Sequence, residues 1–240
     1  MSYYLDFLQK TFFYDIRYPS VTLIIILFSF LNSFFLVGQV KYARNNEGML
    51  SYSASATSIN SSSALSGQIS YSPKGKQGIG LMYLYNMSPE INGLGILLEQ
   101  YLFRPIDGAG IGINIIASAA KTWSTVTETI VYGYVNGSFK QSQSEYSVKG
   151  QSVMLGLELF LHLPDRVFAP EPFLQISRTF SKAGSSKRTI TSNDNSYVFG
   201  IDSIIGRMNK NFDSVAFGYV IHDKFKPTFT VNVSLLHVIL

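Results

Sequence analysis

The sequence predicts an all-β protein, a closed antiparallel barrel of about ten strands that spans a membrane. The clearest observation is the run Ser152–Leu163, in which every odd-numbered residue is Val or Leu. Side chains on a strand point to alternate faces, so this run has one wholly apolar face and one mixed face. Similar runs, separated by turns, recur from about residue 48 to the end of the chain. Lipid outside and a polar lumen inside would produce this pattern.

The composition supports a strand-rich membrane protein. Hydrophobic residues make up 46% of the chain and charged residues only 14%, against about 25% charged residues in soluble domains. The chain has 15 Tyr and 18 Phe, which favour strands. The net charge of +4 is modest and dispersed, so no nucleic-acid partner is expected. The absence of cysteine excludes disulfides, thiolate metal sites and a nucleophilic thiol.

The N-terminal region contains an uncharged apolar segment, Val21–Gly38. Its length lies between that of a signal-peptide core and that of a transmembrane helix. Lys10 and Arg17 precede this segment, and Gly38 supplies a small residue for cleavage. We therefore expect residues 1–38 to be a signal peptide, or else an uncleaved signal anchor, and residues 39–240 to form the barrel.

The expected strands are alternating runs bounded by turn residues, at 50–58, 63–72, 78–86, 93–103, 109–120, 151–163, 172–181, 196–206, 212–221 and 228–239. The short connections between them are rich in Pro, Gly, Asn and Ser, as tight turns require. Ten is an even number, as a closed bacterial barrel requires. Eight strands would result if the first hairpin belonged to the lead-in. Twelve would result if the polar segment at 121–150 entered the membrane.

Two connections, 121–150 and 182–195, are predicted to be long loops on the same side of the barrel. The first contains Asn136-Gly137, a strong hairpin signal, between two segments that are polar on both faces. We expect these segments, Thr125–Val135 and Phe139–Val148, to form a hairpin that projects into water. Short turns at one end and longer loops at the other are typical of a membrane barrel.

Aromatic residues gather near the ends of the expected strands. They are Tyr71, Tyr83, Tyr85, Tyr101, Phe103, Phe173, Phe180, Tyr197 and Phe199. Rings at both ends of an apolar band form the girdles that meet lipid headgroups.

These features together resemble the small bacterial outer-membrane β-barrel proteins, over roughly residues 48–240. The resemblance implies location in the bacterial outer membrane, contact with its lipids, and insertion by the barrel-assembly machinery. In that family the last strand usually ends in an aromatic residue, whereas this chain ends in Leu240. The alternation also changes phase within the last strand, and a bulge near Leu235-Leu236 would restore it.

Four titratable residues share parity with the mixed faces: Glu99, Glu158, His162 and Asp202. They are candidates to line the lumen, where the carboxylates would gather. Narrow barrels fill their interiors with side chains, so we interpret these residues first as a structural polar filling. A cation path or a ligand site is the alternative.

A basic segment, Lys182, Lys187 and Arg188, is a candidate contact for anionic lipid or an acidic partner, although such a run is more often a solvated loop. Gly108, Gly110 and Gly112 share parity. We interpret them as a smooth strip of the inner wall that leaves room for large side chains opposite.

The chemistry-bearing residues give no enzyme motif. The three histidines have no serine in a recognisable local pattern, so no catalytic residue, metal site or cofactor is predicted. We expect a non-enzymatic protein that is structural or binds an unidentified surface ligand through its loops. A narrow pore with an acidic lumen is the first alternative. A soluble β-sandwich tethered by the N-terminal helix is the second.

Overall fold

The computed structural model describes residues 48–59, 62–73, 77–87, 90–103, 109–135, 138–163, 168, 170–185, 189–208, 211–224 and 226–239. Over these ranges no helix is long and apolar enough to span a bilayer. Segment Val21–Gly38 lies outside the described residues, so the signal peptide stays a prediction.

Ten strands make up the described part of the chain. They are β1 (Gly48–Ile59), β2 (Ser62–Ser72), β3 (Gln77–Met87), β4 (Glu90–Phe103), β5 (Gly110–Val135), β6 (Ser138–His162), β7 (Glu171–Gly184), β8 (Thr189–Met208), β9 (Asn211–His222) and β10 (Thr228–Ile239). Every expected strand has its counterpart here.

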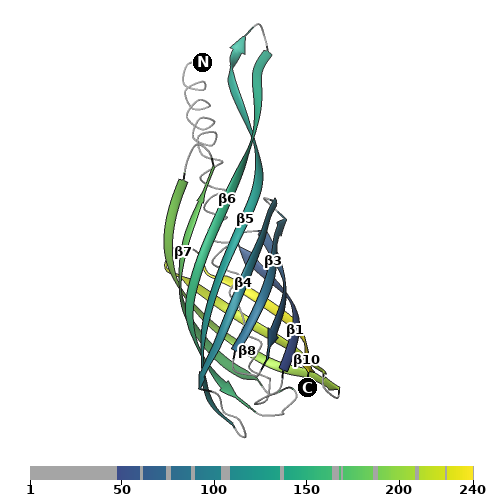
Figure 1. Cartoon of the computed structure of the whole chain (residues 1–240). Helices are drawn as coiled ribbons and strands as arrows, with labels where there is room; N and C mark the ends of the chain where they lie inside the picture. Colours follow the sequence, from purple (N-terminus) through teal and green to yellow (C-terminus); the bar gives the residue numbers. More distant parts are fainter. Residues whose placement is uncertain are drawn as a thin grey trace.

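Each strand pairs antiparallel with the next in the chain, and β1 pairs with β10, so the sheet closes on itself (Figure 1). The closing pairs run from Gly48 opposite Ile239 to Ser58 opposite Phe229. The predicted ten-strand closed barrel is confirmed. The eight-strand and twelve-strand alternatives are wrong, and so is the tethered sandwich, which would need two separate packed sheets.

The last strand has no bulge near Leu235-Leu236. Strand β10 pairs with both neighbours there without a register shift. The phase change in the sequence arises because Leu236, an apolar residue, faces the lumen and is buried. Register shifts occur instead between Tyr101 and Phe103, Val131 and Gly133, and Ile204 and Gly206.

The two faces of the wall differ in chemistry as the alternation predicts. On β6, Val153, Leu155 and Leu157 are exposed on the outside, whereas Ser152 and Glu158 are buried inside. The same division holds around the barrel: most large exposed side chains are apolar or aromatic, and most buried polar side chains face inward. Within the barrel wall all strand edges are paired, so the wall satisfies its own backbone hydrogen bonds without water. These properties identify a transmembrane β-barrel of the bacterial outer-membrane type.

Most of the predicted girdle aromatics point outward, including Tyr71, Tyr83 and Phe180. Tyr101 and Phe173 do not, because they share the inward parity of Glu99 and Gln175 and are buried in the lumen. For these two residues, the direction of the side chain follows from the parity of the position along the strand, and not from its nearness to the strand end.

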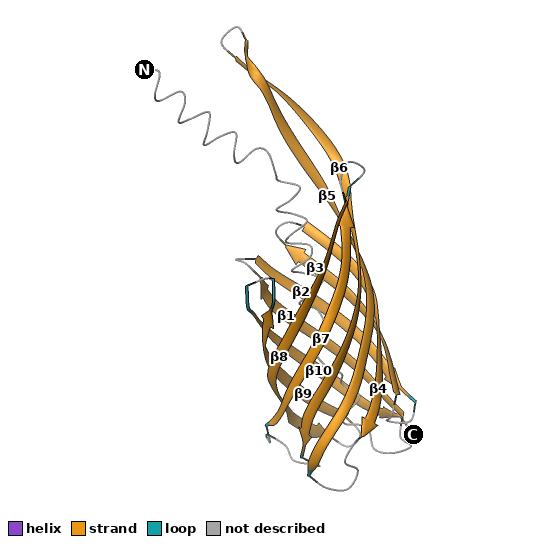
Figure 2. Ribbon diagram, turned by 90° about the vertical axis from the view of Figure 1, so that its left-hand side faces the viewer, coloured by secondary structure: helices purple, strands orange, loops and turns teal. Residues whose placement is uncertain are grey.

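Strands β5 and β6 are the longest of the ten and rise above the rim of the barrel (Figures 1 and 2). The last residue of β5 paired with β4 is Trp123, and the first residue of β6 paired with β7 is Lys149. Beyond those points the two strands pair only with each other. We call this two-stranded part, residues 124–135 and 138–148, the ribbon. Twelve residues of β5 extend it by roughly 40 Å.

The connection expected at 182–195 is shorter in the structure. Strand β7 continues to Gly184 and β8 starts at Thr189, with Lys182 opposite Thr191 and Arg178 opposite Asn195. The sequence of segment 182–195 is typical of a loop because its outward residues are polar. Polar outward residues also suit a strand that has left the apolar band.

Candidate functional site in the lumen and on the ribbon

The four predicted lumen residues are all buried inside the barrel. Glu99 lies on β4, Glu158 and His162 on β6, and Asp202 on β8, each on the inward face. The three carboxylates are on strands that do not pair with one another. They therefore lie at three places around the inner wall, with β5 and β7 between them.

A fourth acid, Glu171, completes a row of titratable groups at the end of the lumen near the chain's C-terminus. Its Oε1 lies 3.4 Å from Nδ1 of His162 and accepts a hydrogen bond of 2.8 Å from the backbone N–H of Leu163. Across the next strand pair Glu171 faces Asp202. Glu171 is not among the predicted lumen residues, because the strand expected from the sequence starts at Pro172. Its parity with Phe173 was the available signal.

An aromatic layer lies beside this row. Phe160 and Phe173 face each other across β6 and β7, and each ring lies over a glycine of the strand on its other side. A Cβ built on Gly112 would be 2.2 Å from Cζ of Phe160. A Cβ on Gly200 would be 2.1 Å from Cζ of Phe173. The smooth strip predicted on the inner wall is thus confirmed at Gly112.

Apolar side chains occupy more of the lumen than the predicted polar filling implies. Tyr101 meets Phe160 edge-on, with ring centroids 5.8 Å apart, in a buried cluster that continues to Val198 and Val220. A second buried cluster includes Met82, Leu84 and Met154. The inner wall therefore combines acidic and amide groups with packed apolar patches.

A buried hydrogen-bonded chain joins β8, β9 and β10 at the opposite end of the lumen. Nδ1 of His222 lies 3.0 Å from Oδ2 of Asp194, and Nε2 lies 3.5 Å from Oγ1 of Thr228. The other oxygen of Asp194 accepts a hydrogen bond of 3.2 Å from the backbone N–H of Lys224. No local sequence pattern indicates this contact, because Asp194 and His222 are 28 residues apart along the chain.

The Asp–His–Thr order resembles that of hydrolytic triads, in which a carboxylate orients an imidazole beside a hydroxyl. Here the Asp194 and His222 side chains are each only 1% exposed, and Thr228 is buried as well. The carboxylate is shared with the backbone of the β9–β10 connection. This geometry joins three strands at the rim. Among the described residues, no group of His, Asp and Glu is arranged to hold a metal ion.

Three lysines gather on the outer wall at the base of the ribbon. Lys182, the described member of the predicted basic segment, is exposed on β7, while Lys187 and Arg188 lie outside the described residues. Gln151 on β6 stands between Lys182 and Lys121 in the strand register. Lys149 is also exposed on β6, opposite Trp123. Lys121 and Lys149 are not part of the predicted basic segment, because they are far from residue 182 along the chain.

The base of the ribbon is fixed to the rim. Val148 is fully buried, and Tyr146 packs against the same apolar cluster as Val148. The hydroxyl of Ser124 donates a hydrogen bond of 2.6 Å to the backbone oxygen of Glu90. Just above, Thr127 and Glu145 are opposite each other and exposed. The ribbon is therefore held at its base.

Comparison with known proteins gave structural likenesses only. No family model matches the chain, and no curated protein matches it. The translocator domain of autotransporter NalP from Neisseria meningitidis has 8% identity and a TM-score of 0.47, over 88% of this chain and 92% of that one. The β domain of the Bordetella autotransporter BrkA has 9% identity and a TM-score of 0.45, over 81% and 100%. The outer membrane protease OmpT from Escherichia coli has 10% identity and a TM-score of 0.42, over 80% and 95%.

Proposed function

We propose that this outer-membrane barrel presents the ribbon outside the cell as a binding arm and carries out no chemistry itself. The observation that supports this is the free-standing pair of strands above Trp123 and Lys149. A bilayer-spanning strand needs only about 9–11 residues, so the additional length of β5 and β6 has no use in crossing the membrane. Binding segments are commonly placed on rigid scaffolds, which fix their position.

The ribbon leaves the barrel at the end opposite Gly48 and Ile239, the first and last described residues (Figure 2). In bacterial outer-membrane barrels the longer connections face the outside. The ribbon's two outer strand edges carry backbone N–H and C=O groups with no further strand beside them. Such edges bind extended segments of other chains, which is the mode of recognition we expect.

The test uses a shortened variant in which Asn-Gly replaces residues 128–144. Thr127 and Glu145 face each other in the register, so a two-residue turn joins them without disturbing the base. Vesicles with either form are tested for attachment to immobilised matrix proteins, mucins and the producing cells. We expect attachment with the full protein and loss of it with the short one. Equal attachment of both forms, or none by the full protein, would contradict the proposal.

A narrow pore is the second candidate, favoured by the buried acids Glu99, Glu158 and Asp202 on the inner wall. The packed rings of Tyr101, Phe160 and Phe173 in the lumen argue against an open path. Planar-bilayer recording separates the two functions. Stable unitary conductance that changes in Glu158→Gln and persists in the shortened variant would favour the pore.

A further inference from the structure

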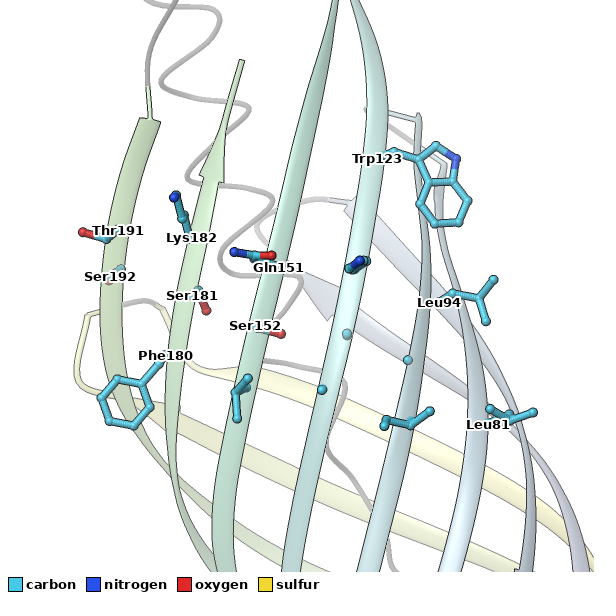
Figure 3. A pocket seen from close by; sticks show the side chains of 16 residues that line it. Leu81, Leu94, Trp123, Gln151, Ser152, Phe180, Ser181, Lys182, Thr191 and Ser192 are labelled. Carbon is cyan, nitrogen blue, oxygen red and sulfur yellow. The ribbon is translucent and has the colours of Figure 1, made fainter. Parts of the chain in front are cut away.

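We infer that the outer wall at the base of the ribbon is a binding site for a phosphorylated, multiply acylated glycolipid of the outer leaflet. Two adjoining grooves form the site. The lower one, of about 870 Å³, has Leu81, Leu94 and Trp123 on one side and Phe180 on the other (Figure 3). The upper one, of about 500 Å³, is lined by Lys121, Lys149 and Lys182.

The lower groove is suited to acyl chains. Its exposed walls are mainly apolar, with Lys121 and Lys182 where it adjoins the upper groove. Its floor is Ala119 together with the backbone at Gly95 and Ala120, two residues that face the lumen. The lining extends from Leu81 on β3 to Thr191 on β8, and neighbouring strands are about 4.8 Å apart. The groove is therefore wide enough to take several chains side by side.

The upper groove is suited to an anionic headgroup. Lys121, Lys149 and Lys182 belong to three successive strands, so their attachment points span about 10 Å across the wall. Neither groove has an Asp or Glu among its described lining residues. Gln151 and Trp123 border both grooves and supply donors between the charged and apolar parts. A headgroup with two separated phosphates matches this arrangement better than one with a single phosphate.

The position of the site along the barrel selects the leaflet. Trp123 is the last residue of β5 that pairs with β4, so the lysines lie where the ribbon leaves the wall. That end faces outside in a barrel of this type. Lysines at a membrane surface contribute about 1 kcal/mol each to anionic lipid binding, or roughly fivefold per lysine. Three lysines thus give a preference of about a hundredfold over a neutral lipid.

Trp123 is the only tryptophan of the chain, so tryptophan fluorescence reports on this site alone. The full barrel is reconstituted in vesicles of phosphatidylcholine with brominated chains, which quench an adjacent indole. Unbrominated lipid A, a disaccharide with two phosphates and several acyl chains, is then titrated in. We expect the fluorescence to recover at a mole fraction of lipid A about a hundredfold lower than if the two lipids surrounded the barrel at random. Recovery should need far more lipid A in the triple variant with Lys121, Lys149 and Lys182 each changed to Gln, but not in the matched control Lys226→Gln.

Two further comparisons keep the inference falsifiable if the triple variant folds poorly. The unaltered protein should show no preference for dephosphorylated lipid A over neutral lipid. Ala119→Phe, which fills the floor, should weaken binding, whereas Ala54→Phe on the outward face of β1 should not. Equal recovery with lipid A, its dephosphorylated form and neutral lipid would overturn the site. Equal recovery with lipid A and phosphatidylglycerol would show a general anionic-lipid surface and overturn the assignment to a glycolipid.

Discussion

At the scale of single residues, glycine and phenylalanine determine how the lumen packs. Gly112 and Gly200 leave the wall bare where the rings of Phe160 and Phe173 lie. Because Phe160 and Phe173 are neighbours across β6 and β7, both rings avoid collision by turning toward the glycine on the far side. The layer depends on four residues from four strands.

We predict that Gly112→Val lowers the free energy of unfolding by about 1–3 kcal/mol, the usual cost of overpacking a filled interior. Its Cβ would meet the Phe160 ring, which has little room to move. Urea titration of vesicle-inserted protein, followed by gel mobility without heating, measures the effect. Gly67→Val is the matched control, because a Cβ at Gly67 has nothing within 4 Å. A similar loss in both variants would contradict this account of Gly112.

At the scale of elements, the sequence predicted all ten strands and the hairpin around Asn136-Gly137, because periodicity and turn residues are local signals. It did not predict that β5 and β6 run unbroken from the membrane into the ribbon. A change from apolar to polar outward residues reads as a strand end, although the backbone continues. The end of β7 and the start of β8 were shortened for the same reason.

The site was less predictable than the strands. Parity placed Glu99, Glu158, His162 and Asp202 on the inner wall. Pairing decides which side chains meet, and pairing is non-local. The contact of His222 with Asp194 and the gathering of Lys121 with Lys149 and Lys182 both depend on register across strands. No spacing within the sequence encodes those contacts.

For the ribbon, we predict cleavage after Lys140 when trypsin is added to intact cells. A two-stranded ribbon with no third strand beside it is marginally stable, so it opens locally to a protease. Lysines of the barrel wall should resist cleavage because their strands are paired on both sides. Mass spectrometry of the fragments locates the cut. Cleavage seen only after the outer membrane is permeabilised would mean that the ribbon faces the periplasm.

At the scale of the whole molecule, the chain divides its surface between lipid outside and polar or packed groups inside. Closure by β1 and β10 removes every sheet edge from the membrane. The wall thus supplies stability, location and orientation. The ribbon and the two grooves at its base are additions to this wall, and both are near one rim.

The N-terminal region gives a separate prediction for the whole chain. Protein extracted from membranes should begin near Gln39, because Val21–Gly38 has the length and low charge of a cleavable signal core. N-terminal sequencing of the extracted protein measures this directly. Met1 or Ser2 at the start would instead establish an uncleaved anchor.

The central claim is that the odd-numbered residues of β6 face lipid and the even-numbered ones face the interior. A spin label placed at each position from Ser152 to Leu161 tests it, with accessibility to oxygen and to a water-soluble nickel complex as the readout. Oxygen accessibility should alternate with a period of two and peak at Val153, Leu155, Leu157, Leu159 and Leu161. High nickel accessibility at those odd positions would place the apolar face in water and contradict the membrane-spanning barrel.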